Sequence, residues 1–354
     1  MANTNYICNV TDVIIDHKLI FKKPSGTSRG ILLDKNSSFI VSRDTDGVLG
    51  IGEVSTIRGL SPENTNQITP FIRTALSAND RHQFCMKHQL PAVLFGLEMY
   101  KKSTSSLEPF ELFPSSFQSG EEGIPINGLI WMGDKKAMFD QICRKLDEGF
   151  RCLKLKIGAI DFLEELDLLQ YVRGQFSSDE VELRVDANGA FHPDDAMEKL
   201  NRLSELALHS IEQPIAAGQI NDMAEICAST HLPIALDEEL IGVKSYKEKE
   251  EIILAIRPQY IILKPSLVGG WRESEEWIEI AEKNKIGWWI TSALEANVGL
   301  NAIAQWTATL GSSMYQGLGT GGLYENNVDS PLYIKDAALW YDPHAQWSTS
   351  VFDS

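Results

Sequence analysis

Short apolar runs alternate with stretches of helical periodicity from residue 124 to residue 317. Each apolar run has the length and residue types of a β-strand. The eight runs are Ile124–Trp131, Leu153–Ile157, Val181–Val185, Leu208–Ile211, Ile234–Leu236, Tyr260–Leu263, Trp288–Thr291 and Met314–Gly317. The stretch after the first run, Asp134–Glu148, has an apolar stripe at helical spacing and ends before Gly149. Eight strands with crossover helices between them predict an α/β fold with a TIM-type barrel.

Residues 1–115 show a different pattern. Two β-rich runs, Ile31–Arg43 and Val48–Ile57, flank an Asp-Thr-Asp-Gly sequence, and its Asp-Gly pair favours a hairpin turn. With Tyr6–Ile15 they predict a small antiparallel sheet. Helices are expected in two later segments, Thr69–Leu76 and Ala92–Tyr100. These residues are therefore predicted to form an α+β domain of their own.

A polar and basic stretch, Lys22–Gly30, lies between the first two predicted strands. Such a stretch is typical of a surface loop. Alternatively, residues 18–30 form a mobile lid loop that brings Arg29 or a lysine to an anionic ligand. The sequence leaves both interpretations open.

The polar segment Ser103–Glu122 contains Pro114 and Gly120 and is interpreted as the linker to the barrel. The barrel domain is assigned to residues 116–325. Residues 326–354 are too few for another domain, so we expect them to pack back on the first one.

Candidate chemistry begins in the second predicted barrel strand. Its alternation places Lys154 and Lys156 on one face, and two ammonium groups on so apolar a strand need compensating anions. One charged residue follows at the end of each of the next four strands. Starting from Lys156, the successive steps are 30, 26, 25 and 27 residues. The four residues are Asp186, Glu212, Asp237 and Lys264. The intervals are about one strand–helix unit each, and the carboxyl ends of parallel barrel strands converge on one mouth.

Three converging carboxylates, from Asp186, Glu212 and Asp237, need a cation if all are to stay ionised. Oxygen ligands with open positions favour Mg²⁺ or Mn²⁺ over Zn²⁺. Asn188 shares the face of Asp186 and is expected either to contact the metal or the substrate, or to cap the next helix.

The three lysines would approach this centre from two sides, Lys154 and Lys156 from one and Lys264 from the other. A nearby divalent cation and other ammonium groups lower a lysine pKa toward the range of a general base. The combination indicates removal of a proton α to a carboxylate, while the metal holds the enediolate oxygens.

Composition excludes some classes of partner. The net charge of −17 argues against nucleic acid, which requires clustered Lys and Arg. We see no signal-peptide pattern and no apolar run of the roughly 20 residues that span a bilayer. Five scattered cysteines without CxxC spacing are expected to be free thiols in a reducing cytoplasm. The sequence does not determine the oligomeric state.

Taken together, the motifs resemble the enolase superfamily, in its muconate-lactonizing-enzyme-like subgroup. The motifs are Lys-x-Lys at 154–156, Arg184-Val185-Asp186-Ala187-Asn188-Gly189, Ile211-Glu212-Gln213-Pro214, Leu236-Asp237-Glu238 and Leu263-Lys264-Pro265. The resemblance covers essentially the whole chain and implies an N-terminal α+β capping domain followed by a (β/α)7β barrel.

Within that subgroup the chain is most similar to the o-succinylbenzoate synthase family of menaquinone biosynthesis, on residues 24–30, 127–133 and 288–295. This resemblance implies a lyase that dehydrates 2-succinyl-6-hydroxy-2,4-cyclohexadiene-1-carboxylate to 2-succinylbenzoate. It implies that Lys156 is the base and then the acid, that Lys264 stabilises charge from the opposite face, and that Lys154 contacts the carboxylate. Ser292, Gly317 and Arg29 are implied as contacts of the succinyl group.

Other activities remain open at this point. An N-acylamino acid racemase or a dipeptide epimerase of the same subgroup would use the same two lysines, and muconate cycloisomerisation is a third possibility. Dipeptide epimerases typically carry Asp-x-Asp at the eighth strand, whereas residues 317–323 contain no acid. An alternative of another class is a non-catalytic barrel that binds an anion at Gly317–Gly322, but it leaves the three carboxylates unexplained.

Overall fold

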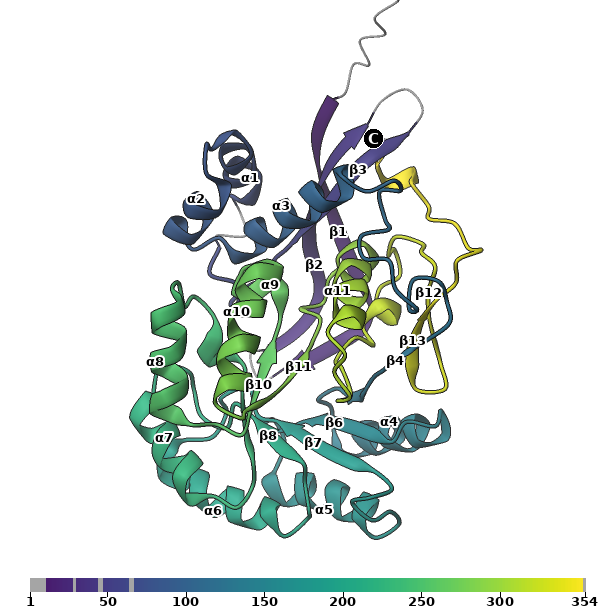
Figure 1. Cartoon of the computed structure of the whole chain (residues 1–354). Helices are drawn as coiled ribbons and strands as arrows, with labels where there is room; N and C mark the ends of the chain where they lie inside the picture. Colours follow the sequence, from purple (N-terminus) through teal and green to yellow (C-terminus); the bar gives the residue numbers. More distant parts are fainter. Residues whose placement is uncertain (1–10, 28–29, 44–46, 64–66, 353–354) are drawn as a thin grey trace, which may run out of the picture.

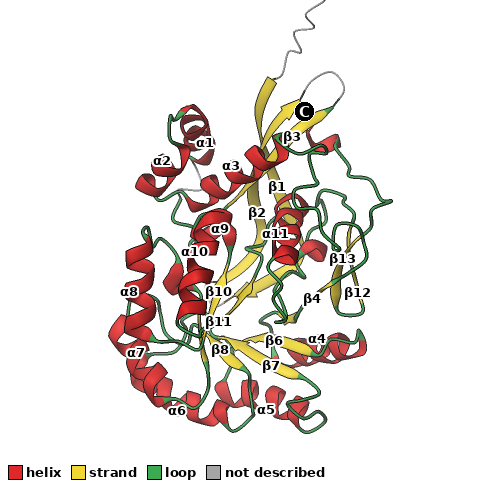
Figure 2. Ribbon diagram, viewed as in Figure 1, coloured by secondary structure: helices red, strands yellow, loops and turns green. Residues whose placement is uncertain are grey.

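The structure is a computed structural model that describes residues 11–27, 30–43, 47–63 and 67–352. It contains three sheets within these residues. An antiparallel sheet and three helices come from the N-terminal part, and a seven-stranded parallel sheet with its helices follows. A small antiparallel sheet joins the C-terminal residues to the segment before the parallel sheet (Figures 1 and 2).

The N-terminal sheet is a meander of three strands, β1 (Thr11–Thr27), β2 (Gly30–Arg43) and β3 (Val48–Ser55). The helices are α1 (Ile68–Ser77), α2 (Arg81–His88) and α3 (Pro91–Thr104). The α+β composition and the second and third strands were predicted from sequence, as were α1 and α3, but α2 was not. Residues 6–10 and 44–46, where a strand start and a turn were predicted, lie outside the described residues.

Residues 18–27, which were predicted as part of a loop or lid, belong to a strand, so the loop conformation is wrong, whereas the lid role stays a prediction. β1 continues to Thr27, and the end of the hairpin pairs Ser25 with Leu32 and Gly26 with Ile31. Its pairing register shifts between Ile20 and Ser25, a stretch that contains Pro24. Proline lacks the N–H of a ladder bond and is tolerated at such an irregularity. A polar, proline-containing sequence therefore looked like a loop although it forms a hairpin arm.

The parallel sheet has its strands in sequence order along its width. They are β5 (Gly128–Ile130), β6 (Cys152–Lys156), β7 (Glu182–Asp186), β8 (Ser210–Glu212), β9 (Ile234–Leu236), β10 (Tyr260–Leu263) and β11 (Gly287–Ile290). The helices between them are α4 (Lys135–Asp147), α5 (Phe162–Arg173), α6 (Pro193–Ser204), α7 (Ile220–Ser229), α8 (Tyr246–Ile256), α9 (Pro265–Val268) and α10 (Gly270–Lys283); α11 (Asn297–Thr309) follows β11. Helices α5–α8 form an arc around the outside of the curled sheet (Figure 1).

The predicted eighth strand is present only as isolated bridges. Gln316 pairs with Ile126 and Gly317 pairs with Thr291, both in parallel orientation. The predicted first strand, Ile124–Trp131, is also divided in two. Its first part, β4 (Ile124–Pro125), belongs to the small antiparallel sheet, and only β5 joins the parallel sheet.

The C-terminal residues return to the N-terminal sheet. Strands β12 (Leu332–Lys335) and β13 (Ala338–Tyr341) pair with each other, and β13 pairs with β4. Farther along, the Arg43 guanidinium donates a hydrogen bond of 2.7 Å to the carbonyl oxygen of Phe352. Domain boundaries at residues 115 and 325 stay predictions.

Two carboxylates of the N-terminal domain cap helices that belong to the parallel sheet. Glu53 accepts hydrogen bonds of 2.8 Å from the backbone N–H groups of Ala296 and Gly299, at the start of α11. Glu98 accepts one of 2.7 Å from the N–H of Trp271, in the first turn of α10. Because these N–H groups have no partner within their own helix, both carboxylates fix the N-terminal domain against the larger one.

The interface carboxyl of Glu98 predicts a pH dependence of stability. Burial raises its pKa to about 7, compared with an ordinary value of 4.5. A carboxyl whose pKa is raised by folding loses its contribution to stability as the pH rises from about 4.5 through 7. Between pH 5 and pH 8 we therefore expect the free energy of unfolding to fall by up to about 3 kcal/mol more in the wild type than in Glu98→Gln.

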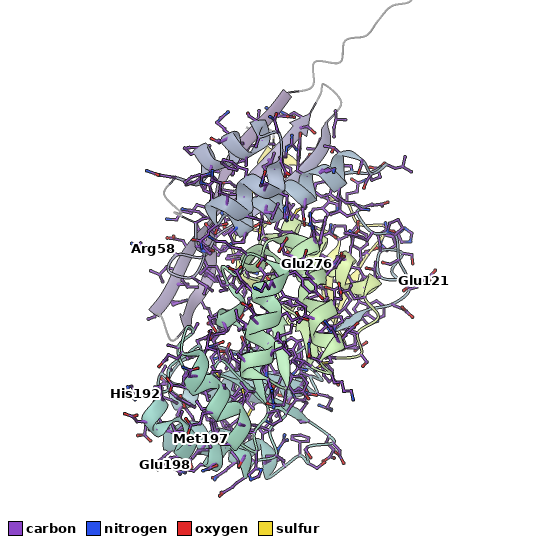
Figure 3. The ribbon with its side chains drawn as sticks, turned by 60° about the vertical axis from the view of Figure 1, so that its left-hand side comes forward. Arg58, Glu121, His192, Met197, Glu198 and Glu276 are labelled. Carbon is purple, nitrogen blue, oxygen red and sulfur yellow. The ribbon has the colours of Figure 1, made fainter. Side chains whose placement is uncertain are left out.

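Urea unfolding of both proteins at the two pH values measures this difference. Glu121→Gln is the matched control because Glu121 is exposed at the surface (Figure 3), and it should follow the wild type. Equal pH dependence in the wild type and in Glu98→Gln would show that Glu98 does not titrate in this range.

Candidate active site

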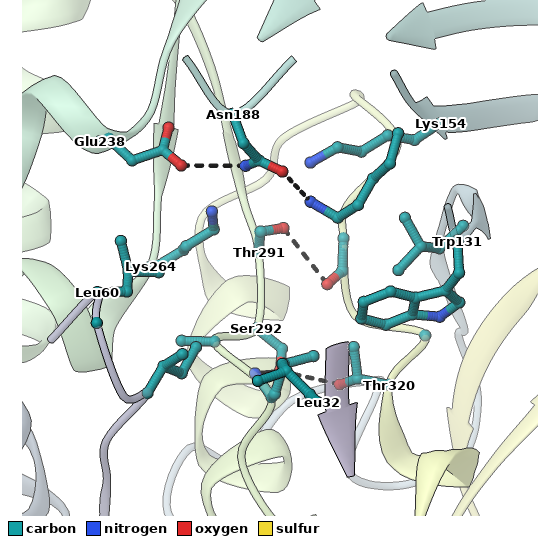
Figure 4. Close-up of a pocket in the computed structure, with 18 of the residues that line it drawn as sticks. Leu32, Leu60, Trp131, Lys154, Asn188, Glu238, Lys264, Thr291, Ser292 and Thr320 are labelled. Carbon is teal, nitrogen blue, oxygen red and sulfur yellow. Dashed lines mark hydrogen bonds between the residues drawn. The ribbon is translucent and has the colours of Figure 1, made fainter. Parts of the chain in front are cut away.

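A cavity of about 430 Å³ lies between the carboxyl ends of the parallel strands and the N-terminal domain. The N-terminal domain contributes the end of the β1–β2 hairpin and the loop after β3, at Gly30–Leu32 and Ile57–Leu60. The parallel sheet contributes side chains from its strand ends and from the loops that follow them, including Lys154, Lys156, Asn188, Glu238, Lys264 and Ser292 (Figure 4).

Strand register brings the predicted charged residues together. Lys156 is the Cα partner of Asp186, and Asp186 is the partner of Glu212. Lys154 and Lys156 alternate with Leu153 and Leu155, which are buried. In a strand, alternate residues share a face, so both lysines point away from the apolar layer that holds β6 in place.

The three carboxylates are buried, with exposed fractions of 0% for Asp186, 2% for Glu212 and 3% for Asp237. The ammonium groups of the three lysines lie between them, so positive and negative charges alternate. Lys156 Nζ is 2.9 Å from Asp186 Oδ2, and Lys154 Nζ is 3.0 Å from the same oxygen and also pairs with Glu212. Lys264 Nζ is 3.6 Å from Glu212 Oε1 and pairs with Asp237. Lys154 and Lys264 reach the cavity from opposite sides and face each other across it (Figure 4).

The carboxylates govern the protonation of the lysines. Burial opposes the charged form of Lys154, but attraction to Asp186 and Glu212 outweighs burial and raises its pKa above the ordinary value. The same balance, with Asp237 and Glu212 as the anions, raises the pKa of Lys264. The sequence led us to expect lowered lysine pKa values beside a divalent cation. The raised pKa values of Lys154 and Lys264 apply to a site in which carboxylates are the nearest charges, so the expectation for the cation-bound site stays a prediction.

The donor set has the chemistry of a site for Mg²⁺ or Mn²⁺. Its three side chains offer buried carboxylate oxygens, and the two oxygens of Glu212 pair with the ammonium groups of Lys154 and Lys264. Lys154 contacts two of the three carboxylates and supplies the positive charge between them. Within residues 11–27, 30–43, 47–63 and 67–352, no three His, Cys, Asp or Glu side chains are grouped closely enough to hold a metal. A cation held by Asp186, Glu212 and Asp237 would therefore require these three carboxylates to lie closer together than they do here.

Asn188 is fixed beside the lysines. It follows Asp186 in the left-handed region, with φ of 45°, which Asn tolerates better than most residues. Its backbone N–H donates to Asp186 Oδ1 at 2.9 Å. Its side-chain oxygen accepts a hydrogen bond of 2.7 Å from Lys156 Nζ, and its side-chain nitrogen donates one of 3.0 Å to Glu238 Oε1. The side chain of Asn188 thus contacts Lys156 and Glu238, and its predicted contact with a metal or a substrate stays a prediction.

Ser292 and Gly317 also line the cavity, as expected. A Cβ atom at position 317 would overlap Thr291, so the close approach of these two segments requires glycine. The Ser292 hydroxyl donates to Glu295 at 2.6 Å and accepts from Thr320 at 2.9 Å. The Ser292 oxygen also accepts a hydrogen bond of 3.0 Å from the N–H of Leu294, so these contacts hold its hydroxyl in place in the wall.

Arg29 lies outside the described residues, so its predicted contact is not tested. A different arginine, Arg58, lines the mouth of the cavity from the loop after β3 and is exposed (Figure 3). Sequence reasoning missed Arg58 and Glu238. Glu238 could have been found from its position directly after Asp237, whereas nothing in the local pattern identifies Arg58.

Comparison with known proteins agrees with this geometry. The family model for the Enolase C-terminal domain-like family matches residues 137–345. A curated relative, the o-succinylbenzoate synthase of Desulfotalea psychrophila, is 47% identical over 355 residues, which cover 91% of this chain and 96% of the relative. The chain belongs to the enolase superfamily. The resemblance found in the sequence is thereby confirmed.

Solved structures of the superfamily have the same fold. The crystal structure of MenC from Desulfotalea psychrophila matches with a TM-score of 0.82 and 42% identity, over 94% of this chain and 99% of that one. A muconate lactonizing enzyme from Pseudomonas fluorescens, solved with muconolactone, matches with a TM-score of 0.79 over 96% of both chains. At 22% identity it supports the fold alone. No helix among the described residues of this superfamily member is long and apolar enough to cross a membrane.

Proposed function

We propose that the protein is an o-succinylbenzoate synthase, a hydro-lyase that dehydrates 2-succinyl-6-hydroxy-2,4-cyclohexadiene-1-carboxylate to 2-succinylbenzoate in menaquinone biosynthesis. The observation that carries the proposal is the relative at 47% identity, together with the charged residues that this chain brings to one cavity. A small-molecule carboxylate substrate and a cytoplasmic location are part of the proposal.

Lys156 is the proposed base. As a neutral amine it takes the proton from the ring carbon that carries the carboxylate, and the electrons of that C–H bond move into the carboxylate to give an enediolate. Collapse of the enediolate breaks the neighbouring C–O bond. Lys156, now an ammonium, gives its proton to the departing hydroxyl, so water leaves and the ring becomes aromatic. The same group serves as base and acid because both events occur beside it.

The other charged residues stabilise the carboxylate as it gains charge. A divalent cation held by Asp186, Glu212 and Asp237 would supply Lewis-acid stabilisation of the enediolate oxygens. Lys264 is assigned to act as an ammonium that adds positive charge from the opposite side of the cavity. Lys154, which lines the cavity, is assigned to contact the substrate carboxylate.

The apolar wall of the cavity suits the rest of the substrate. Leu32, Leu60 and Trp131 surround the space next to the lysines (Figure 4). These side chains contact the ring and keep water from the enediolate. The guanidinium of Arg58, which also lines the cavity, is assigned to the succinyl carboxylate.

We also propose that the curled sheet closes as a (β/α)7β barrel. Support comes from the segment after α11: the N–H of Gly317 donates to Ile290 at 2.8 Å on one edge of the sheet. On the other edge, the N–H of Asn127 donates to the carbonyl of Gln316 at 3.0 Å. This segment thus takes the place of the eighth strand.

Turnover of the cyclohexadiene substrate, followed by absorbance, tests the proposed function. We expect rapid aromatisation with Mg²⁺, loss of turnover in excess EDTA, and recovery when Mg²⁺ is restored. Circular dichroism in EDTA is the control for folding. A folded, Mg²⁺-binding protein without turnover would contradict the synthase assignment and favour N-acylamino acid racemisation, measured by α-proton exchange in D₂O. Tight anion binding without any metal dependence would favour the non-catalytic alternative.

A further inference from the structure

Glu238 takes no part in the reaction proposed above, yet it is 8% exposed and lines the cavity. It begins the short 3-10 helix Glu238–Leu240 directly after β9. Its Oε1 accepts the hydrogen bond from Asn188 Nδ2, and Asn188 Oδ1 accepts one from Lys156 Nζ. Glu238, Asn188 and Lys156 thus form a continuous chain of hydrogen bonds, drawn as dashed lines in Figure 4.

The two ends of this hydrogen-bonded chain, Glu238 and Lys156, fix the orientation of the Asn188 amide between them. A carboxylate can only accept hydrogen bonds, so the NH₂ of the amide must face Glu238. The carbonyl oxygen must then face Lys156. If the amide were reversed, its oxygen would oppose the carboxylate of Glu238 and its NH₂ would oppose Lys156.

That orientation matters most when Lys156 is neutral. A neutral amine has two N–H donors and one lone pair, arranged tetrahedrally. Asp186 Oδ2 at 2.9 Å and Asn188 Oδ1 at 2.7 Å are two acceptors for the two donors. The lone pair is thereby left to the third tetrahedral direction of Lys156 Nζ, and Lys156 lines the cavity in which the substrate is proposed to bind. A reversed amide would instead donate an N–H to the lone pair and block it.

We propose that Glu238 is a positioning residue that directs the lone pair of Lys156 through Asn188. The proposal rests on the assignment of Lys156 as the base. Glu238 contacts neither the reacting carbon nor the base. Its effect therefore appears in the rate of proton removal and only when Asn188 is present.

A double-mutant cycle tests this dependence. Glu238→Ala and Asn188→Ala should each lower kcat by about 10- to 100-fold with KM changed less than about 3-fold. In the Asn188→Ala background, adding Glu238→Ala should cost less than about 3-fold, because the group that it orients is gone. If Glu238→Ala lowers kcat equally in both backgrounds, Glu238 acts independently of Asn188 and the proposal fails.

Glu238→Gln supplies a second, milder variant of the same size. Glutamine can donate as well as accept, so it permits both orientations of Asn188, and kcat should fall between those of the wild type and Glu238→Ala. Wild-type kcat in Glu238→Gln would show that a carboxylate is not required and would overturn the proposal. Thermal unfolding of each variant verifies that the fold is kept.

Failure of the proposed function is distinguishable from failure of this inference. If the wild type is active as a synthase and the effects of Glu238→Ala and Asn188→Ala are additive, only the proposed role of Glu238 is contradicted. A wild type without synthase turnover removes the proposed function, and the same cycle is then measured by α-proton exchange of an N-succinylamino acid in D₂O. There too, a loss that disappears in the Asn188→Ala background supports the inference, and an additive loss overturns it.

Discussion

Replacing Lys156 with alanine is expected to lower kcat by at least about 10⁴-fold while the protein stays folded. The loss is this large because one amine is proposed to remove the ring proton and then to protonate the leaving hydroxyl. Folding should survive because Asp186, the buried carboxylate that Lys156 contacts, keeps Lys154 at 3.0 Å. Absorbance-monitored turnover at saturating Mg²⁺ gives kcat, and circular dichroism with thermal unfolding verifies the folded state.

The matched control is Lys135→Ala. Lys135 pairs with Asp167 on the surface, where both side chains are substantially exposed, so its removal should change kcat by less than about twofold. In D₂O, Lys156→Ala should also lose exchange of the substrate α-proton, because exchange requires the same base. Turnover above about a hundredth of the wild-type rate would mean that another group removes the proton, and the role of Lys156 would be wrong.

Sequence alone gave the strands of the parallel sheet most accurately where apolar runs have sharp ends. Ile234–Leu236 and Tyr260–Leu263 were predicted to the residue, since each run is short, apolar and ends at a charged residue that enters the site. Asp237 and Lys264 were identified as site residues because they directly follow the ends of these two strands. Register along a parallel sheet then brings charges from neighbouring strands together, as it does for Lys156 and Asp186.

The features that could not be predicted from the sequence depend on contacts between segments that are distant along the chain. The hairpin arm containing Pro24 looked like a loop because its pairing with β2 is not visible in its own composition. The partner of Asn188, Glu238, lies 50 residues away, and the choice between a helix cap and a site residue depended on that contact. Likewise, the caps that Glu53 provides to α11 join residues more than 240 positions apart. Local patterns carry no information about such pairs.

The charge balance of the site could be anticipated only in part. Alternating lysines on β6 predicted that anions would be near, and Asp186 and Glu212 do contact Lys154. The lowered lysine pKa values predicted beside a divalent cation stay a prediction, because the direction depends on which charge is nearest to each ammonium. Attraction from two buried carboxylates outweighs the burial cost for Lys154 and for Lys264.

Lys264→Ala is expected to lower kcat by about 10³-fold or more at saturating Mg²⁺. Lys264 is proposed to stabilise the enediolate as an ammonium from the side opposite Lys154, and its pKa is raised by Asp237 and Glu212. Removing it takes positive charge away from the developing anion and leaves Asp237 without its paired cation. Absorbance-monitored turnover gives kcat, and Mg²⁺ titration of each protein gives the metal affinity.

Stability should fall as well, because removal of one partner of a buried ion pair typically costs about 3–5 kcal/mol. Lys264→Met keeps most of the side-chain volume without the charge, so it separates the electrostatic effect from a packing defect. Both variants should lose turnover to a similar degree, although the methionine variant should unfold at the higher temperature. If Lys264→Met retained more than about a tenth of the wild-type kcat while folded, the positive charge on this side would not be needed, and Lys264 would serve only to hold Asp237 in place.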